Sequence, residues 1–167
     1  MDAMEAILTR RSIRRYTVQA VSAELIQELL QAAMSAPSAG NQQDWHLVVV
    51  RNRQVLDELG RVHSHAPLSG APLAIVVCGD LQRESHKGFW QQDCAAATQN
   101  LLLAAHARGL GAVWCGCYPR EERVAAIRKV LDLPEHIVPL ALVVIGYPGE
   151  QKGRQDRYDP AKVRVID

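Results

Sequence analysis

The chain has 167 residues, of which 48% are hydrophobic and 22% charged, and its formal net charge is +1. This length is typical of one domain, so we expect a single domain over residues 1–167. The apolar fraction excludes intrinsic disorder, because it can offset the ordering entropy of one core. The near-zero net charge gives no general cationic field, so we expect neither nucleic acid nor a membrane as a partner.

Hydropathy and cysteine usage point to a cytoplasmic protein. No segment reaches the roughly 20 apolar residues of a membrane-spanning helix, and the longest runs only from Ile137 to Ile145. The first residues do not have the pattern of a targeting peptide. Apolar or alanine-rich surroundings favour reduced, buried thiols over disulfides for the four cysteines, Cys78, Cys94, Cys115 and Cys117.

Helices and strands alternate along the first half of the chain. Apolar residues at helical spacing and short β-branched runs predict these elements. They are a helix from Met4 to Leu8, a helix capped by Ser22 that continues to Ala33, a strand from Leu47 to Val50, a helix from Arg53 to Val62 and a strand from Leu73 to Cys78.

The second half contains a helix that is apolar on nearly every side, from Gln92 to Arg108, which Gly109 ends. We expect part of its surface to face another subunit. The alternative is a central helix wrapped by its own chain. The remaining predicted elements are a strand from Ala112 to Cys115, a helix from Glu121 to Leu131 and a strand from Ile137 to Ile145.

The carboxyl-terminal segment from Tyr147 is polar and ends in an apolar alternation at Val163, Val165 and Ile166. Such an alternation can add a strand to an open sheet edge. The polar arm before it is long enough to reach the sheet of a neighbouring molecule.

Four arginines lie within the six positions from Arg10 to Arg15, a segment we call the arginine knot. Guanidinium groups donate in a fork that matches phosphate, and the Ser12 hydroxyl can add a donor. The pattern suits an anion site as well as it suits a solvated charged face.

A second polar segment runs from Pro37 to Trp45 and is rich in amide side chains. Asn and Gln both donate and accept hydrogen bonds, so this loop could bind the edge of a heterocycle. The alternative is a capped turn in which Trp45 fills the core.

Other motifs argue against familiar chemistries. The glycines at Gly109 and Gly111 precede a strand, whereas a dinucleotide fingerprint follows one. Cys115 and Cys117 share a strand face but have no second ligand pair for zinc. His63 and His65 lack an evident carboxylate partner and are expected at the surface. We therefore expect no metal site and no catalytic side chain.

Four motifs occur in order over essentially the whole chain. They are the segment Arg10 to Arg14, the loop Pro37 to Gln42, the helix start Gln92 to Asn100 running into Gly109 to Gly111, and the segment Ile145 to Pro148. Together they resemble the FMN-dependent nitroreductase family.

This resemblance implies an α+β fold, with a mixed β-sheet flanked by helices. It implies an intertwined homodimer in which the carboxyl-terminal tail is exchanged onto the partner, and two tightly bound FMN molecules at the subunit interface. Hydride would pass from NADH or NADPH through FMN to a nitroaromatic, a quinone or a similar small acceptor by a ping-pong mechanism. Alternatives are an enone, free-flavin or halogenated-phenol reductase, and a non-catalytic flavin or anion binder.

The resemblance also implies site residues. The FMN phosphate, ribityl chain and N1/O2 pole would be held by Arg10, Arg11, Ser12 and Arg14. The partner's loop would approach the same flavin with Pro37, Ser38, Ala39 and Asn41. The N5 edge would face the backbone of Cys115 and Gly116, next to Trp114. A basic tail residue would complete the phosphate site, best matched by Arg157, with Arg154 or Lys152 as substitutes.

Several positions depart from the family pattern, among them Cys115 and Cys117, which replace the small or hydroxyl residues usual beside the ring. Asp44 stands where a proline often precedes the tryptophan, and Gln155 stands where many relatives have a basic residue. The cofactor carries the electron chemistry in such enzymes, so the lack of a catalytic triad or carboxylate pair is expected.

Overall fold

A computed structural model describes residues 1–167. Its four strands are β1 (Trp45–Val50), β2 (Leu73–Asp80), β3 (Gly111–Gly116) and β4 (Ile137–Gly146). They form one sheet in the order β1-β2-β4-β3, and all neighbouring strands are antiparallel. A parallel contact is also present, as an isolated bridge between Ser12 and Ala112 beside β3. The sheet is therefore mixed only through this bridge. β2 and β4 lie centrally and are buried on both faces, which explains their continuous apolar sequences.

The helices begin and end close to the predicted positions. They are α1 (Ala3–Thr9), α2 (Ala23–Met34), α3 (Arg53–Val62), α4 (Trp90–Ala107), α5 (Glu121–Val130) and the short 3-10 turns η1 (Ala39–Asn41) and η2 (Pro160–Lys162). The predicted cap is confirmed, since the Ser22 hydroxyl accepts a hydrogen bond from the Leu25 amide at 3.3 Å. Gly109 follows α4 with a φ of +74°, a conformation that glycine adopts readily at a helix end.

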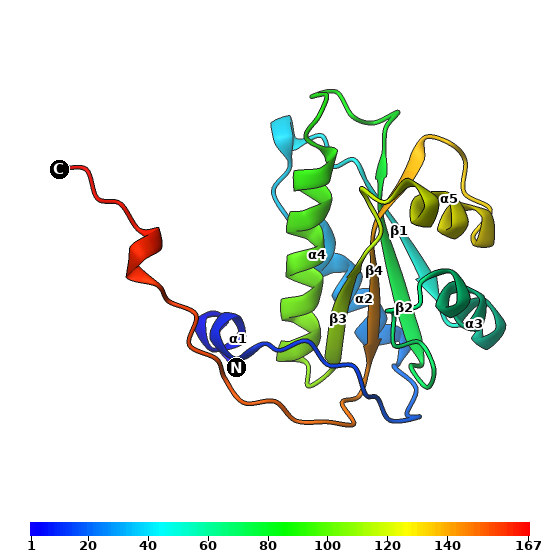
Figure 1. The fold of residues 1–167 in the computed structure, drawn as a ribbon, viewed down its shortest axis with the longest axis horizontal. Coiled ribbons are helices and arrows are strands. Elements are labelled where there is room, and N and C mark those ends of the chain that lie inside the picture. The colour runs from blue at the N-terminus through cyan, green and yellow to red at the C-terminus, as the bar shows by residue number, and fades with distance from the viewer.

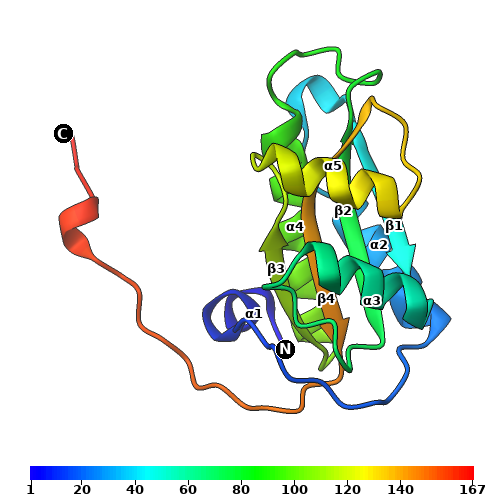
Figure 2. The same cartoon turned by 45° about the vertical axis from the view of Figure 1, so that its right-hand side comes forward.

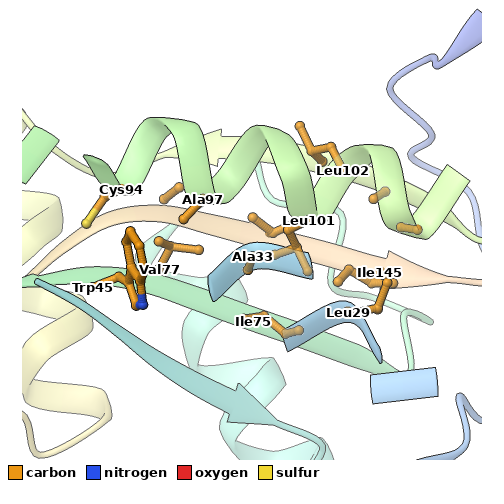
Figure 3. Packing of buried hydrophobic residues seen from close by; sticks show 14 of the residues in the cluster. Leu29, Ala33, Trp45, Ile75, Val77, Cys94, Ala97, Leu101, Leu102 and Ile145 are labelled. Carbon is orange, nitrogen blue, oxygen red and sulfur yellow. The ribbon is translucent and has the colours of Figure 1, made fainter. Parts of the chain in front are cut away.

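The sheet is covered by helices on both faces, which confirms the α+β fold (Figures 1 and 2). One face packs against α2 and α4, and the other against α3 and α5. Figure 3 shows the core on the α4 side, where Leu101 lies near Ala33 of α2 and Trp45 lies near Cys94. Trp45 is only 8% exposed, so it fills the core.

The long helix α4 packs against the sheet, α2 and α1, but part of its surface stays open. Ala97 and Leu101 are fully buried against the sheet. Leu103 and Ala104 are half-buried, and with α1 and α2 they line an apolar hollow of about 360 Å³. This apolar surface of α4 is therefore only partly covered by other parts of the same chain.

After β4 the chain leaves the body of the molecule as an extended arm (Figures 1 and 2). Val163, Val165 and Ile166 are 55%, 73% and 81% exposed and form no strand within this chain. The expected exchange of this tail onto a partner stays a prediction. None of the helices combines the length and the apolarity needed to span a membrane.

Candidate functional site

The arginine knot lies along the outer edge of β3. The Ile13 amide donates to the Ala112 carbonyl at 3.0 Å, and the Ile13 side chain occupies the space where a Cβ on Gly111 would stand. The Tyr16 hydroxyl lies 2.6 Å from the Ile13 carbonyl oxygen and 3.1 Å from that of Val144. The sheet edge therefore fixes the backbone of the knot, and Gly111 is required for this close approach.

Positive charges gather at the start of the knot. The pKa of Arg10 is lowered by partial burial and by repulsion from Arg157 and Arg11. The pKa of His106, at the end of α4, is lowered by burial and by Arg10. None of the three arginines forms an ion pair with a carboxylate. The cluster therefore suits a bound anion such as phosphate.

The first residues of the tail are tied to the knot. The Arg14 amide donates to Glu150 Oε1 at 2.6 Å, and Lys152 Nζ donates to the Ser12 carbonyl at 2.8 Å. Lys152 also pairs with Glu150 at 3.0 Å, and the Arg11 guanidinium donates to the Gly153 carbonyl. The Arg14 amide and Lys152 keep the pKa of Glu150 below its usual value. Lys152 is thus engaged internally.

The other two basic tail residues differ in their surroundings. Arg154 is exposed and makes no hydrogen bond, whereas Arg157 lies close enough to Arg10 to lower its pKa. Between the tail and the end of α4 is a cavity of about 380 Å³ lined in part by Thr9, Arg11 and Lys152. Arg157 is therefore the tail residue best placed to share an anion with Arg10.

A second cavity, of about 390 Å³, lies at the far end of β3 and is lined by Arg14, Trp114, Cys115 and Gly116, among others. Gly116 is exposed, and a Cβ built there would meet nothing within 4 Å. Trp114, two residues earlier in the strand, is 36% exposed. This end of β3 therefore offers open backbone next to an aromatic ring, which suits a flat heterocycle.

The cysteines are free and buried, as predicted. Burial raises the pKa of Cys115 to about 11 and that of Cys117 to about 12. Both thiols are therefore neutral near pH 7 and poor nucleophiles.

The expectation of a surface position is wrong for His63. It is 2% exposed, and its Nε2 lies 3.0 Å from the Gly116 carbonyl oxygen. Arg123 Nη1 donates to the same oxygen at 2.6 Å. His63 follows α3 and Arg123 lies in α5, so no local sequence pattern predicts that they meet. Both also line the Gly116 cavity, together with the exposed His65.

The loop from Pro37 to Gln43 is held by the start of α4. The Ala39 amide donates to Asp93 Oδ1 at 3.0 Å, and Gln42 Nε2 donates to Asp93 Oδ2 at 2.7 Å. Gly40 and Asn41 adopt positive φ angles of 55° and 56°, which Gly and Asn tolerate best. The loop therefore has a defined shape, as the capped-turn alternative requires.

Asp44, which stands where relatives often have proline, is buried and hydrogen-bonded to the loop. Gln42 Nε2 donates to Asp44 Oδ2 at 3.1 Å, while Asp44 Oδ1 is buried without a partner. Burial, followed by repulsion from Asp93, raises the pKa of Asp44 to about 6. Because the folded chain holds this proton more tightly than the unfolded chain, Asp44 makes stability fall as pH rises from about 4 to about 6.

Replacing Asp44 with Asn should therefore stabilise the protein at neutral pH. At about 1.4 kcal/mol for each tenfold change in proton affinity, we expect a gain of about 1 to 3 kcal/mol at pH 7.5 that nearly vanishes at pH 4. Urea unfolding at both pH values measures the change. Asp57→Asn, which removes an exposed carboxylate paired with Arg53, is the control and should change stability by less than about 1 kcal/mol. An equal gain from Asp44→Asn at both pH values would contradict this account.

The structure brings some predicted site residues together and separates others. Arg10, Arg11, Ser12, Arg14 and the strand end at 114–116 share one edge of the sheet. The loop at 37–41 precedes β1, which forms the opposite edge. Three strand spacings of about 4.8 Å separate the two edges. One chain alone therefore does not place this loop beside the knot.

Comparisons with known proteins identify the family of this chain. The nitroreductase family model matches residues 7–66 and 61–147. A relative from Methanothermobacter thermautotrophicus, provisionally named an NADH dehydrogenase/NAD(P)H nitroreductase, is 49% identical over 99% of this chain and 87% of its own.

Two solved structures share the fold. One is an FMN-dependent nitroreductase of Clostridium difficile, with a TM-score of 0.90 and 29% identity over 98% of this chain and 99% of the other. The second, from Desulfovibrio desulfuricans, is provisionally named a nitroreductase and was solved in complex with FMN. It has a TM-score of 0.85 and 33% identity over 100% of this chain and 98% of the other. On this sequence match and this shared fold, the chain belongs to the nitroreductase family.

Proposed function

We propose that this chain is an NAD(P)H-dependent FMN oxidoreductase that reduces a nitroaromatic, a quinone or a similar small acceptor. The observation that carries the proposal is that the arginine cluster and the open strand end lie along one edge of β3. Ser12 is bridged to Ala112, four residues before Gly116, which corresponds to about 13 Å along the strand. An elongated ligand with a phosphate at one end and a flat ring at the other fits this edge.

Each part of FMN has a matching group on the chain. Arg10, Arg11 and Arg157 would hold the phosphate, and Ser12 would contact the phosphate or the ribityl chain. Arg14 lies in the cavity with Gly116, where its charge would favour the reduced, negatively charged ring. Trp114, Cys115 and Gly116 would face the ring edge, Cys115 through its backbone because its thiol is buried.

When bound, FMN supplies two-electron chemistry between a nicotinamide and an acceptor. The chain then needs only to bind and orient the ring and to stabilise the negative charge of its reduced form. The neutral, buried thiols and the lack of a carboxylate in the Gly116 cavity support a mechanism without a catalytic side chain. Solvent would provide the protons for the product.

The site is completed by a second copy of the chain in this proposal. The exposed apolar side of α4 would form the contact between subunits, and the partner's Pro37, Ser38, Ala39 and Asn41 would approach the flavin across it. The tail would extend onto the partner and add a strand there. The separation of loop and knot on opposite sheet edges supports a homodimer, because only another molecule can then supply the loop.

Steady-state kinetics on the purified protein test the proposed function. Denaturation should release FMN, and oxidation of NADH or NADPH should depend on an added nitroaromatic or quinone. If both substrates use one site in turn, double-reciprocal plots give parallel lines. Intersecting lines would contradict the shared site, and FMN without any turnover would favour a non-catalytic flavin binder. An enone, free flavin or a halogenated phenol as the best acceptor would change the substrate class alone.

A further inference from the structure

The carbonyl oxygen of Gly116 receives two side-chain donors from two different elements. His63 Nε2 lies 3.0 Å away and Arg123 Nη1 lies 2.6 Å away. The next residue is also fixed, because the Cys117 amide donates to the Leu140 carbonyl at 2.9 Å. The peptide at the end of β3 is therefore held from both sides of the Gly116–Cys117 bond.

This double contact matters because Gly116 has no side chain to restrict its backbone. A glycine at an exposed strand end explores more conformations than any other residue. His63 is 2% exposed and is held in the core, so it acts as an immobile donor. A carbonyl can only accept, which assigns the Nε2–H tautomer to His63 and leaves its buried Nδ1 without a partner. The tautomer is thus set by the Gly116 contact.

Arg123 adds a charge as well as a hydrogen bond. It is half-buried and forms no ion pair, and its side chain donates only to the Gly116 carbonyl oxygen. The cavity that it lines with Arg14 and His65 contains no carboxylate. A positive charge in such a partly closed cavity is screened less than one at the surface, so it acts on a ligand bound there.

We propose that His63 and Arg123 are positioning residues that fix the Gly116 peptide against the flavin ring, and that the charge of Arg123 favours the reduced ring. This inference rests on the proposed function, since it requires FMN at the end of β3. It differs from the assignment of Arg14, because His63 and Arg123 both bond to the Gly116 carbonyl oxygen.

The midpoint potential of bound FMN tests the proposal. Arg123→Gln removes the charge and should reduce the preference for reduced over oxidised FMN at least tenfold, which is about 30 mV for a two-electron couple. Arg123→Lys keeps the charge and should recover more than half of this shift. His63→Phe removes a neutral hydrogen-bond donor. It should reduce the preference for reduced over oxidised FMN about threefold, in the same direction as Arg123→Gln.

The matched control is Arg120→Gln, which removes the same charge at a position three residues earlier. The Arg120 side chain is exposed and does not contact Gly116. Its potential should stay close to that of the unmodified holoenzyme. Equal shifts in Arg123→Gln and Arg120→Gln would overturn the positioning role while leaving the proposed function intact. A purified protein that binds no FMN would overturn both. If His63→Phe does not fold, the comparison of the two arginine variants decides the matter.

Discussion

Replacing Leu103 with Glu should abolish the proposed dimer and, with it, tight FMN binding. Leu103 is half-buried and lines the open apolar hollow between α4, α1 and α2, so a Glu there can reach water in the single chain. In a two-fold dimer the substitution occurs twice across the same contact. Burying an unpaired charge costs about 3 to 5 kcal/mol, so the dissociation constant should rise more than about 10³-fold.

Sedimentation at micromolar concentration measures this effect, and absorbance at the flavin band follows the cofactor in the same run. Val18→Glu is the control, because Val18 is 94% exposed and lies outside the helix. It should remain a yellow dimer. A Leu103→Glu variant that sediments as an FMN-loaded dimer would show that the interface lies elsewhere, and a folded monomer with full FMN occupancy would show that one chain suffices.

Replacing Arg10 with Ala should weaken FMN binding by about 1.5 to 3 kcal/mol, or roughly 10- to 150-fold, the usual size for a charge-assisted hydrogen bond. Partial burial lowers the pKa of Arg10 most, and repulsion from Arg157 and Arg11 lowers it further, so Arg10 lies near two other positive charges. A dianionic phosphate relieves this repulsion. Without FMN, the same substitution should leave the apoprotein no less stable, because it removes repulsion and breaks no ion pair.

Fluorescence quenching of FMN on addition of apoprotein gives the affinity. Arg15→Ala, an exposed change at the far end of the same knot, serves as the control and should alter affinity less than about threefold. Riboflavin, which has no phosphate, should bind Arg10→Ala and the unmodified protein equally. If Arg10→Ala reduces riboflavin binding as strongly as FMN binding, Arg10 contacts the ring or shapes the site, and the phosphate assignment is wrong.

Local patterns predicted most of the fold. Periodicity and caps such as Ser22 located all five helices, and β-branched runs located all four strands, because these signals arise from neighbours within one element. The sheet order required knowledge of which strands meet, which no local pattern contains. The sheet is antiparallel throughout its named strands, and its mixed character is limited to the Ser12 bridge.

The site was predicted unevenly for the same reason. The arginine knot is continuous in sequence, so its residues could be named directly. His63 follows α3 and Arg123 lies in α5, and the two converge on Gly116 only through the tertiary fold. A histidine without a nearby carboxylate gave no reason to expect a buried position, since its partner is a backbone oxygen 53 residues away. Asp44 and Asp93 are likewise separated in sequence and joined through Gln42.

If the tail is exchanged as proposed, its attachment to the arginine knot would link cofactor binding to dimer assembly thermodynamically. Three tail residues form hydrogen bonds with the knot: Glu150 with Arg14, Lys152 with Ser12 and Gly153 with Arg11. The knot residues are the ones proposed to bind FMN. Ordering this segment for one purpose lowers the entropic cost of ordering it for the other. Linkage then requires reciprocity: whatever factor FMN adds to the affinity between subunits, dimerisation adds to the affinity for FMN. At low protein concentration the two would be lost together, so dilution alone could release the flavin without any change in its immediate contacts.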